Sequence, residues 1–252
     1  MLIQPTIEKL YSLRLKGMIK AIDQQMKDPE IGALSFDDRF GLIVDTEVTE
    51  RENSRLNNRL KAAKLKQQAC IENIDLRHSR GLDKTTIKQL ALPQWVKEHR
   101  NVLILGPTGV GKTYLTCSLI HSACRNGFSA LYSRTQRLLQ DLAVARADGS
   151  YKKILARLAK TELLAFDDFG LVSLTDDTSR DLLEIIDDRC QSGSTIIVSQ
   201  LPISHWHETI TNSTLADAIL DRLVHNAYKL NLKGDSYRKQ NQPDTISDTT
   251  SK

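Results

Sequence analysis

The sequence has few of the features that mark membrane, disulfide-rich and metal-cluster proteins. No apolar run approaches the ~18 residues of a membrane span, and the first residues, MLIQPTIEKLYSLRLKG, lack the apolar core and cleavage site of a signal peptide. The four cysteines are scattered without a C-x-x-C pair, which argues against disulfides and zinc. These absences predict a cytoplasmic protein without a membrane partner, whose thiols pack as small hydrophobic groups.

The net charge is also small, so charge alone does not identify a partner. The 35 Lys and Arg residues against 31 Asp and Glu give only +4. However, residues 51–66 contain six basic residues and one acid. Arginines four positions apart share one helical face, which suits the phosphate backbone of DNA. The predicted DNA-binding residues are Arg51, Arg55, Arg59, Lys61 and Lys64. On charge and spacing alone, an ordinary solvated surface is the favoured interpretation, and the family resemblance given below is what favours DNA binding.

Two regions of different pattern make up the chain of 252 residues. In residues 1–75 apolar side chains recur three and four positions apart, which predicts an all-helical domain with a break near Pro29 and Gly32. From Asn101, five short apolar runs alternate with helical stretches, which is typical of a parallel β-sheet between helices. We therefore predict an α/β domain over residues 76–238, which begins with a connector at about 74–99. The polar tail, residues 239–252, cannot bury enough apolar surface to stay ordered.

A phosphate-binding motif follows the first predicted strand. GPTGVGKT, residues 106–113, matches G-x-x-x-x-G-K-[ST] and directly precedes a predicted helix. Its glycines let backbone N–H groups turn toward phosphate oxygens, and the helix N-terminus favours negative charge. The predicted nucleotide-binding residues are Gly106, Pro107, Thr108, Gly109, Val110, Gly111, Lys112 and Thr113. Lys112 would reach the β- and γ-phosphates and Thr113 would bind Mg²⁺, so the predicted cofactors are ATP and Mg²⁺.

Acidic and amide side chains end two further predicted strands. In LLAFDDFG, residues 163–170, Asp167 is the acid that a P-loop requires for Mg²⁺, and Asp168 could act as a general base toward water. Both acids are predicted to lie outside the core, and a helix cap is the alternative role for Asp168. After the fourth predicted strand, Gln200 is the candidate to contact the γ-phosphate and the water, with Ser199 as second choice. The predicted catalytic residues are therefore Lys112, Asp168 and Gln200.

These motifs, in this order with ADAILDRLVHNAYKLNLKGDSYRK, resemble the IstB family of transposition helper ATPases. That family is a branch of the AAA+ ATPases close to the DnaC helicase loaders, and residues 35–65 are similar to it as well. The resemblance implies a P-loop AAA+ domain without a C-terminal lid, preceded by a small helical domain. It also implies that Arg222 is a catalytic arginine finger for a neighbouring protomer. Arg238 matches a nucleotide-sensing arginine of the loaders.

The function implied by the resemblance is an ATP-dependent DNA-binding ATPase that oligomerises on target DNA and assists a transposase. Its partners would be double-stranded DNA, the transposase of the same insertion sequence and further copies of the chain. A DnaC-like helicase loader is one alternative, although the N-terminal similarity argues against it. A small-molecule P-loop kinase would need an arginine-rich lid, for which no insertion is present. A nucleotide-gated scaffold with little hydrolysis is a further alternative, because Asp168 is shorter than the usual glutamate.

Overall fold

The computed structural model describes residues 3–74 and 81–234. It divides into two compact units, residues 1–58 and 59–252. The division lies inside one long helix, whereas the sequence placed the domain boundary near residue 75. Residues 59–74 belong to the second unit because they pack against the helix that follows the P-loop.

Unit 1 consists of helices. These are α1 (Ile3–Ser12), α2 (Lys16–Lys27), the 3₁₀ helix η1 (Pro29–Ala33) and the part of α3 (Phe36–Ala63) up to residue 58. η1 contains the predicted break at Pro29 and Gly32, and α3 is one continuous helix. α2 meets α3 at Gly17, where a Cβ would lie only 2.5 Å from the Glu47 Cα. The Glu47 carboxylate accepts hydrogen bonds from the backbone N–H of Gly17 (2.7 Å) and Met18 (3.2 Å), so it caps the first turn of α2.

Unit 2 is built on a five-stranded parallel sheet, as the five apolar runs predicted. The strands are β1 (Asn101–Leu105), β2 (Ala130–Arg134), β3 (Leu163–Phe169), β4 (Ser194–Ser199) and β5 (Ala227–Asn231), in the order β2-β3-β4-β1-β5. β4 therefore lies between β3 and β1. Since all five strands run in one direction, the residues that follow β1, β3 and β4 meet at one edge of the sheet.

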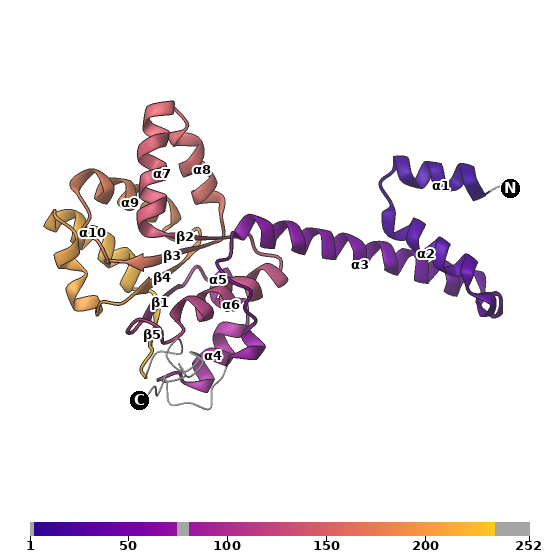
Figure 1. Cartoon of the computed structure of the whole chain (residues 1–252), viewed down its shortest axis with the longest axis horizontal. Helices are drawn as coiled ribbons and strands as arrows, with labels where there is room; N and C mark the ends of the chain where they lie inside the picture. Colours follow the sequence, from indigo (N-terminus) through magenta and orange to yellow (C-terminus); the bar gives the residue numbers. More distant parts are fainter. Residues whose placement is uncertain (1–2, 75–80, 235–252) are drawn as a thin grey trace, which may run out of the picture. The chain divides into compact units, whose positions relative to one another are not determined.

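Helices cover both faces of the sheet (Figure 1). On one face lie α4 (Lys84–Ala91), α5 (Gln94–Lys97) and α6 (Lys112–Arg125). On the other lie α7 (Thr135–Asp148), α8 (Tyr151–Lys160), α9 (Asp176–Arg189) and α10 (Ser213–Val224). Short 3₁₀ helices are η2 (Ile71–Asn73), η3 (Ile203–His205) and η4 (His207–Thr209). Residues 84–97 thus form two helices where the sequence predicted only a connector.

One hydrophobic cluster of unit 2 lies between the sheet and the helices α7 to α10, and α6 is buried against the other face. Leu103, Phe166 and Ile197, from three adjacent strands, are fully buried against this helical layer. Trp206 is fully buried and its ring centroid lies 4.8 Å from that of Phe169, so it is a core residue. This packing holds the ends of β3 and β4 in place beside the P-loop.

After β5 the described chain contains only residues 232–234, and no helical lid is found in the part of unit 2 that the structure describes. The predicted polar tail, 239–252, lies outside the described residues. None of the described helices combines the length and apolar character that a membrane crossing requires.

Candidate nucleotide site

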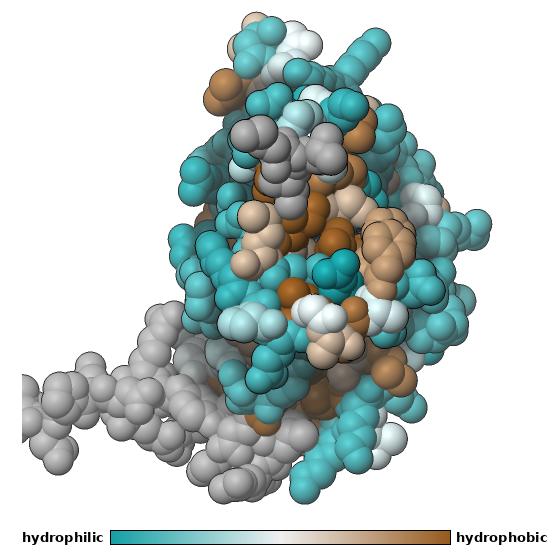
Figure 2. Space-filling model, turned by 90° about the vertical axis from the view of Figure 1, so that its right-hand side faces the viewer, coloured by the Kyte–Doolittle hydropathy of each residue, from teal (hydrophilic) through white to brown (hydrophobic). Residues whose placement is uncertain are grey.

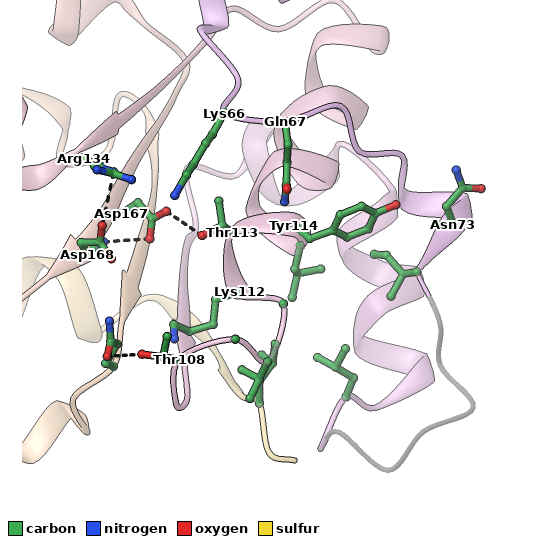
Figure 3. Close-up of a pocket in the computed structure, with 18 residues that line it drawn as sticks. Lys66, Gln67, Asn73, Thr108, Lys112, Thr113, Tyr114, Arg134, Asp167 and Asp168 are labelled. Carbon is green, nitrogen blue, oxygen red and sulfur yellow. Dashed lines mark hydrogen bonds and ion pairs between the residues drawn. The ribbon is translucent and has the colours of Figure 1, made fainter. Parts of the chain in front are cut away.

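A pocket of about 630 Å³ lies beside the P-loop. Its walls include residues 108–113, the acids at the end of β3, and Gln200 after β4 (Figure 3). Residues 66–67 and 73–74, from the segment that follows α3, complete the opposite side. The structure therefore brings the predicted P-loop, acidic pair and amide together around one space.

The P-loop backbone depends on its glycines. Gly106, Gly109 and Gly111 have positive φ angles of 143°, 87° and 98°. A Cβ on Gly106 would lie 2.4 Å from the Leu232 carbonyl oxygen, so this position has no room for a side chain. The loop therefore keeps the open, backbone-lined cradle that a phosphate group requires.

Lys112 supplies the positive charge of this cradle. Its Nζ donates hydrogen bonds to the carbonyl oxygens of Gly106 (2.7 Å) and Pro107 (2.8 Å), and the residue is 8% exposed. Burial lowers the pKa of Lys112, while the nearby charges of Asp167 and Asp168 act in the opposite direction. A phosphate group would restore the charged partner that this buried ammonium lacks.

Asp167 is held by donors from three directions. Its Oδ2 accepts from the Thr113 hydroxyl (2.9 Å) and the Tyr132 hydroxyl (2.5 Å), and its Oδ1 accepts from the Asp168 N–H (2.9 Å). Burial and the bond to Asp167 raise the pKa of Tyr132, so the tyrosine remains a donor. Asp167 is only 2% exposed, so the prediction that it lies outside the core is wrong. The hydroxyl and carboxylate pair of Thr113 and Asp167 nevertheless fits Mg²⁺, which prefers oxygen ligands.

Asp168 is turned away from its neighbour by an irregularity in β3. The register between β3 and β4 shifts between Phe166 and Phe169, and Asp168 has a left-handed φ of 59°. Aspartate tolerates this conformation better than most residues. Its side chain is 32% exposed, lines the pocket, and lies 3.6 Å from the Arg134 Nε. The next helix, α9, is capped by Thr175, so the alternative of Asp168 as a helix cap is wrong.

The two candidates at the end of β4 have different positions. Gln200 lines the pocket and its Oε1 accepts a hydrogen bond from the Thr108 hydroxyl (2.7 Å). Ser199 is fully buried, and its hydroxyl donates to the Phe169 carbonyl (2.7 Å). Ser199 therefore ties β4 to the irregular end of β3, and Gln200 is the group that faces the site.

The two candidate arginines lie apart from this pocket or beyond the described chain. Arg222, on α10, does not line the pocket; its Nε donates to Asp187 (2.8 Å) and its side chain is 32% exposed. A second guanidinium nitrogen of Arg222 donates to the Ala218 carbonyl (2.9 Å), so both contacts are within its own chain. Arg238 lies outside the described residues.

The five predicted DNA-binding residues differ in their contacts. In unit 1, Arg51 and Arg55 are both exposed, and the Arg51 Nε donates to Glu47 (2.6 Å). In unit 2, the Arg59 Nε donates to the Cys124 carbonyl (2.8 Å), and Lys61 and Lys64 are exposed. Arg51 and Arg59 thus have intramolecular roles, which the spacing of the arginines did not indicate.

The residues at the site that were not predicted include Lys66, Gln67 and Arg134, which line the pocket, and Tyr132, which bonds Asp167. Arg134 ends β2, so the rule that parallel strands collect functional groups at their carboxyl ends could have found it. Tyr132 lies within an apolar run and gave no such signal. Lys66 was counted only as part of the basic stretch, because nothing in the sequence places it next to the P-loop.

With this geometry, the similarity to known proteins becomes decisive. The family described as IstB-like ATP binding protein matches residues 8–245 of the chain. The chain belongs to this IstB-like family. A protein of Sinorhizobium fredii named as an insertion sequence ATP-binding protein, y4pL, is 46% identical over 239 residues, which cover 95% of this chain and 98% of the relative. The ATP-binding protein of insertion sequence IS1162 from Pseudomonas fluorescens is 48% identical over 205 residues, covering 81% and 89%.

Solved structures agree on the fold of this IstB-like chain. The crystal structure of the DnaC helicase loader covers 66% of the chain and 97% of its own length, with a TM-score of 0.56 and 19% sequence identity. At this identity the similarity concerns the fold alone, which is that of a P-loop AAA+ domain. The IstB-like family binds ATP, and the P-loop geometry described above is suited to it.

Proposed function

We propose that this IstB-like protein is an ATPase that assembles on target DNA and assists the transposase of its insertion sequence. The observation that carries the proposal is the pocket in which the P-loop, the Thr113–Asp167 pair and Asp168 converge. The insertion-sequence names of its relatives supply the biological setting.

Within the pocket, each side chain has a proposed task. The P-loop amides and Lys112 bind the phosphates, and Thr113 with Asp167 holds Mg²⁺. When bound, Mg²⁺ supplies charge neutralisation for the phosphate oxygens. Asp168 orients and deprotonates the attacking water, since its partly exposed carboxylate lines the same pocket. Gln200, fixed by Thr108, contacts the γ-phosphate side of the site.

The shared-site part of the proposal concerns Arg222 and oligomerisation. An arginine finger acts on the nucleotide of another protomer, so it must lie outside its own pocket. Arg222 satisfies this condition, and its pairing with Asp187 holds the guanidinium at the surface of α10. We propose that ATP binding joins protomers through this arginine and that hydrolysis releases them. Arg238 is kept as a proposed sensor of the nucleotide.

The DNA-binding part of the proposal now depends on the exposed cations of α3 and the residue after it. Arg55, Lys61 and Lys64 are exposed and suited to phosphate contacts. Arg51 and Arg59 would take part only with the nitrogen atoms that their intramolecular bonds leave available. The helical domain, residues 1–75, is proposed as the DNA- and partner-binding region, with the ATPase domain over residues 76–238.

A protein partner is supported by the surface of unit 1. Figure 2, which views the molecule from the right-hand side of Figure 1, shows apolar side chains among hydrophilic ones. The exposed large apolar residues of this unit are Tyr11, Leu13, Met26, Leu34, Phe36, Phe40, Leu42 and Val48. So many apolar side chains on 58 residues favour a role in protein assembly. The transposase and further copies of the chain are the proposed partners.

One alternative function uses the same pocket to bind ATP but involves little ATP hydrolysis. Asp168 is paired with Arg134 at 3.6 Å, so its carboxylate already has a partner other than the attacking water. This observation favours a nucleotide-gated DNA-binding scaffold with little hydrolysis. A DnaC-like helicase loader is supported only by the common fold.

Hydrolysis and assembly can be tested together. The wild-type protein should hydrolyse ATP and should form oligomers on duplex DNA with a non-hydrolysable ATP analogue, seen by electron microscopy. Lys112→Ala should lose ATP binding, because it removes the buried cation of the P-loop. ATP-dependent assembly without measurable hydrolysis would favour the scaffold. Unchanged ATP affinity in Lys112→Ala would contradict the assigned site.

A further inference from the structure

Lys66 is a cation of the nucleotide pocket that the P-loop chemistry leaves unused. It lines the pocket together with Thr113, Asp167 and Asp168. Figure 3 shows its amine directed toward Asp167 and Thr113. The ion pairs found within residues 3–74 and 81–234 do not include Lys66. The nearby carboxylate of Asp168 is already paired with Arg134. A positive charge therefore faces the site without a fixed partner.

The backbone around Lys66 is anchored along α6. The Arg59 Nε donates to the Cys124 carbonyl (2.8 Å), and Ala63 is fully buried. Burial raises the pKa of the Cys117 thiol on α6, and the nearby backbone amides of Gln67 and Lys66 act in the opposite direction, so these residues lie next to α6. Residues 59–67 therefore run from the C-terminal end of α6 toward the P-loop at its N-terminal end.

The end of α3 directs the lysine into the pocket. α3 stops at Ala63, and Lys64 has a left-handed φ of 51°, which changes the direction of the chain. Within three residues of the end of the helix, Lys66 lines the pocket. One continuous set of contacts thus joins the end of α3, helix α6 and the nucleotide pocket.

We propose that Lys66 is a further phosphate ligand, which couples nucleotide binding to residues 59–67 at the end of α3. This proposal rests on the proposed ATP-binding function and deepens it. A triphosphate carries more negative charge than Lys112 and one Mg²⁺ neutralise, and the Asp167 oxygens are already met by Thr113, Tyr132 and the Asp168 N–H. The phosphates are therefore the strongest acceptor for the Lys66 amine.

Nucleotide binding would be coupled to residues 59–67 because these residues pack along α6. A phosphate bond to the Lys66 side chain would hold its backbone against Cys117, so the amides of Lys66 and Gln67 would open less often. The nucleotide would thereby stabilise residues that continue directly from the helix bearing Arg55 and Lys61. ATP should therefore slow hydrogen exchange at these two amides. If Lys66 were only a surface charge without a phosphate contact, its removal would leave this effect of ATP unchanged.

The experiment compares ATP and ADP affinities of wild type, Lys66→Ala, Lys66→Arg and the control Lys153→Ala, with Mg²⁺ and with EDTA. Lys153 is an exposed lysine on α8, away from the pocket, so the control removes an equal charge. Lys66→Ala should weaken ATP binding about tenfold in both conditions, as expected for one hydrogen bond to a charged group. Lys66→Arg should restore part of the affinity, and Lys153→Ala should resemble wild type. ATP should slow exchange at the Lys66 and Gln67 amides of wild type, and at the Gln67 amide much less in Lys66→Ala.

Two results would overturn the proposal while the ATP site stands. Wild-type affinity in Lys66→Ala, with binding still dependent on Lys112, would show that Lys66 does not contact the nucleotide. Tighter Mg²⁺-dependent binding in Lys66→Ala would show that the lysine competes with Mg²⁺ for Asp167. If wild type itself bound no ATP, the proposed function would fail and this proposal with it. Should the alanine variant melt at a lower temperature, Lys66→Gln, which keeps most of the stem, provides the same comparison.

Discussion

At the residue scale, the neighbouring acids of β3 have different environments. Asp167 is buried and bonded on both oxygens, whereas Asp168 is turned into the pocket by a left-handed backbone. Such conformations cost energy and cluster at functional sites. The side chain that lies partly exposed at the pocket, paired with Arg134, is therefore Asp168, and the side chain bonded on both oxygens is Asp167.

Asp168→Asn should leave ATP affinity unchanged and slow hydrolysis by about 10², because the amide cannot accept a proton from water. A phosphate-release assay and a nucleotide titration on the same protein would separate the two effects. Asp188→Asn, at an exposed position of α9, is the matched control and should keep wild-type turnover. Normal hydrolysis in Asp168→Asn would remove Asp168 from catalysis.

At the element scale, the crossing of α2 and α3 depends on one glycine and one buried carboxylate. Burial raises the pKa of Glu47, but hydrogen bonds from Arg51, Met18 and Gly17 outweigh it, so the pKa lies below its usual value. A lowered pKa means that the stabilisation is present above the ordinary pKa and is lost as the pH falls through the folded value. The free energy of unfolding of unit 1 should therefore fall as the pH is lowered and Glu47 takes up a proton. A neutral residue at this position would not contribute this pH dependence.

Gly17→Ala should destabilise unit 1 by about 1–3 kcal/mol, because the new methyl would meet the α3 backbone at 2.5 Å. Gly41→Ala is the matched control on α3, where a Cβ meets no atom within 4 Å. That variant should stabilise the helix by about 0.5–1 kcal/mol, since alanine loses less backbone entropy than glycine. Thermal unfolding and hydrogen exchange within residues 3–58 would measure both, and equal effects would contradict the close crossing.

At the scale of the whole molecule, the proposed arginine finger Arg222 acts on the ATP of a neighbouring protomer, so hydrolysis should require assembly. Arg222→Ala and Lys112→Ala should each abolish hydrolysis alone, but a mixture should regain part of it. Some interfaces would then pair an intact P-loop with an intact Arg222 from the neighbour. Loss of the partly exposed pair with Asp187 should cost little stability.

Arg157→Ala, at an exposed position on α8, is the control for the loss of an arginine and should remain active alone. Co-purification of the two inactive variants must show that they assemble together. If they did so and stayed inactive, Arg222 would not act between protomers.

The affinity for duplex DNA should fall steeply with salt and depend little on sequence, because phosphate contacts release counterions. Arg55→Ala should reduce the slope of log affinity against log salt by about one unit for each protomer contact. Arg55 is the better test than Arg59, since Arg59 also donates to the Cys124 carbonyl. Arg157→Ala is again the control, and an unaltered slope in Arg55→Ala would place the DNA on another surface.

Much of the ATP site could be predicted from the sequence because its parts are local. The P-loop needs glycines, a lysine and a threonine at fixed spacing, and the alternation of apolar runs with helical stretches fixes the parallel sheet. Once β4 lies between β3 and β1, the carboxyl ends of these strands and the residues after them must meet, and Lys112, Asp167 and Gln200 line one pocket there. Two short helices, α4 and α5, were missed because eight and four residues are too few for a clear period.

Only the tertiary structure could decide the rest, since it depends on contacts between residues far apart in the chain. The Tyr132 hydroxyl reaches Asp167 because β2 pairs with β3, and Arg134 meets Asp168 because the register of β3 shifts. Arg59 looks like any other basic residue of α3, yet packing on α6 gives it a backbone acceptor. The same packing moves the boundary between the units to residues 58 and 59 and brings Lys66 into the pocket, since neither helical periodicity nor charge specifies which surface a segment will cover.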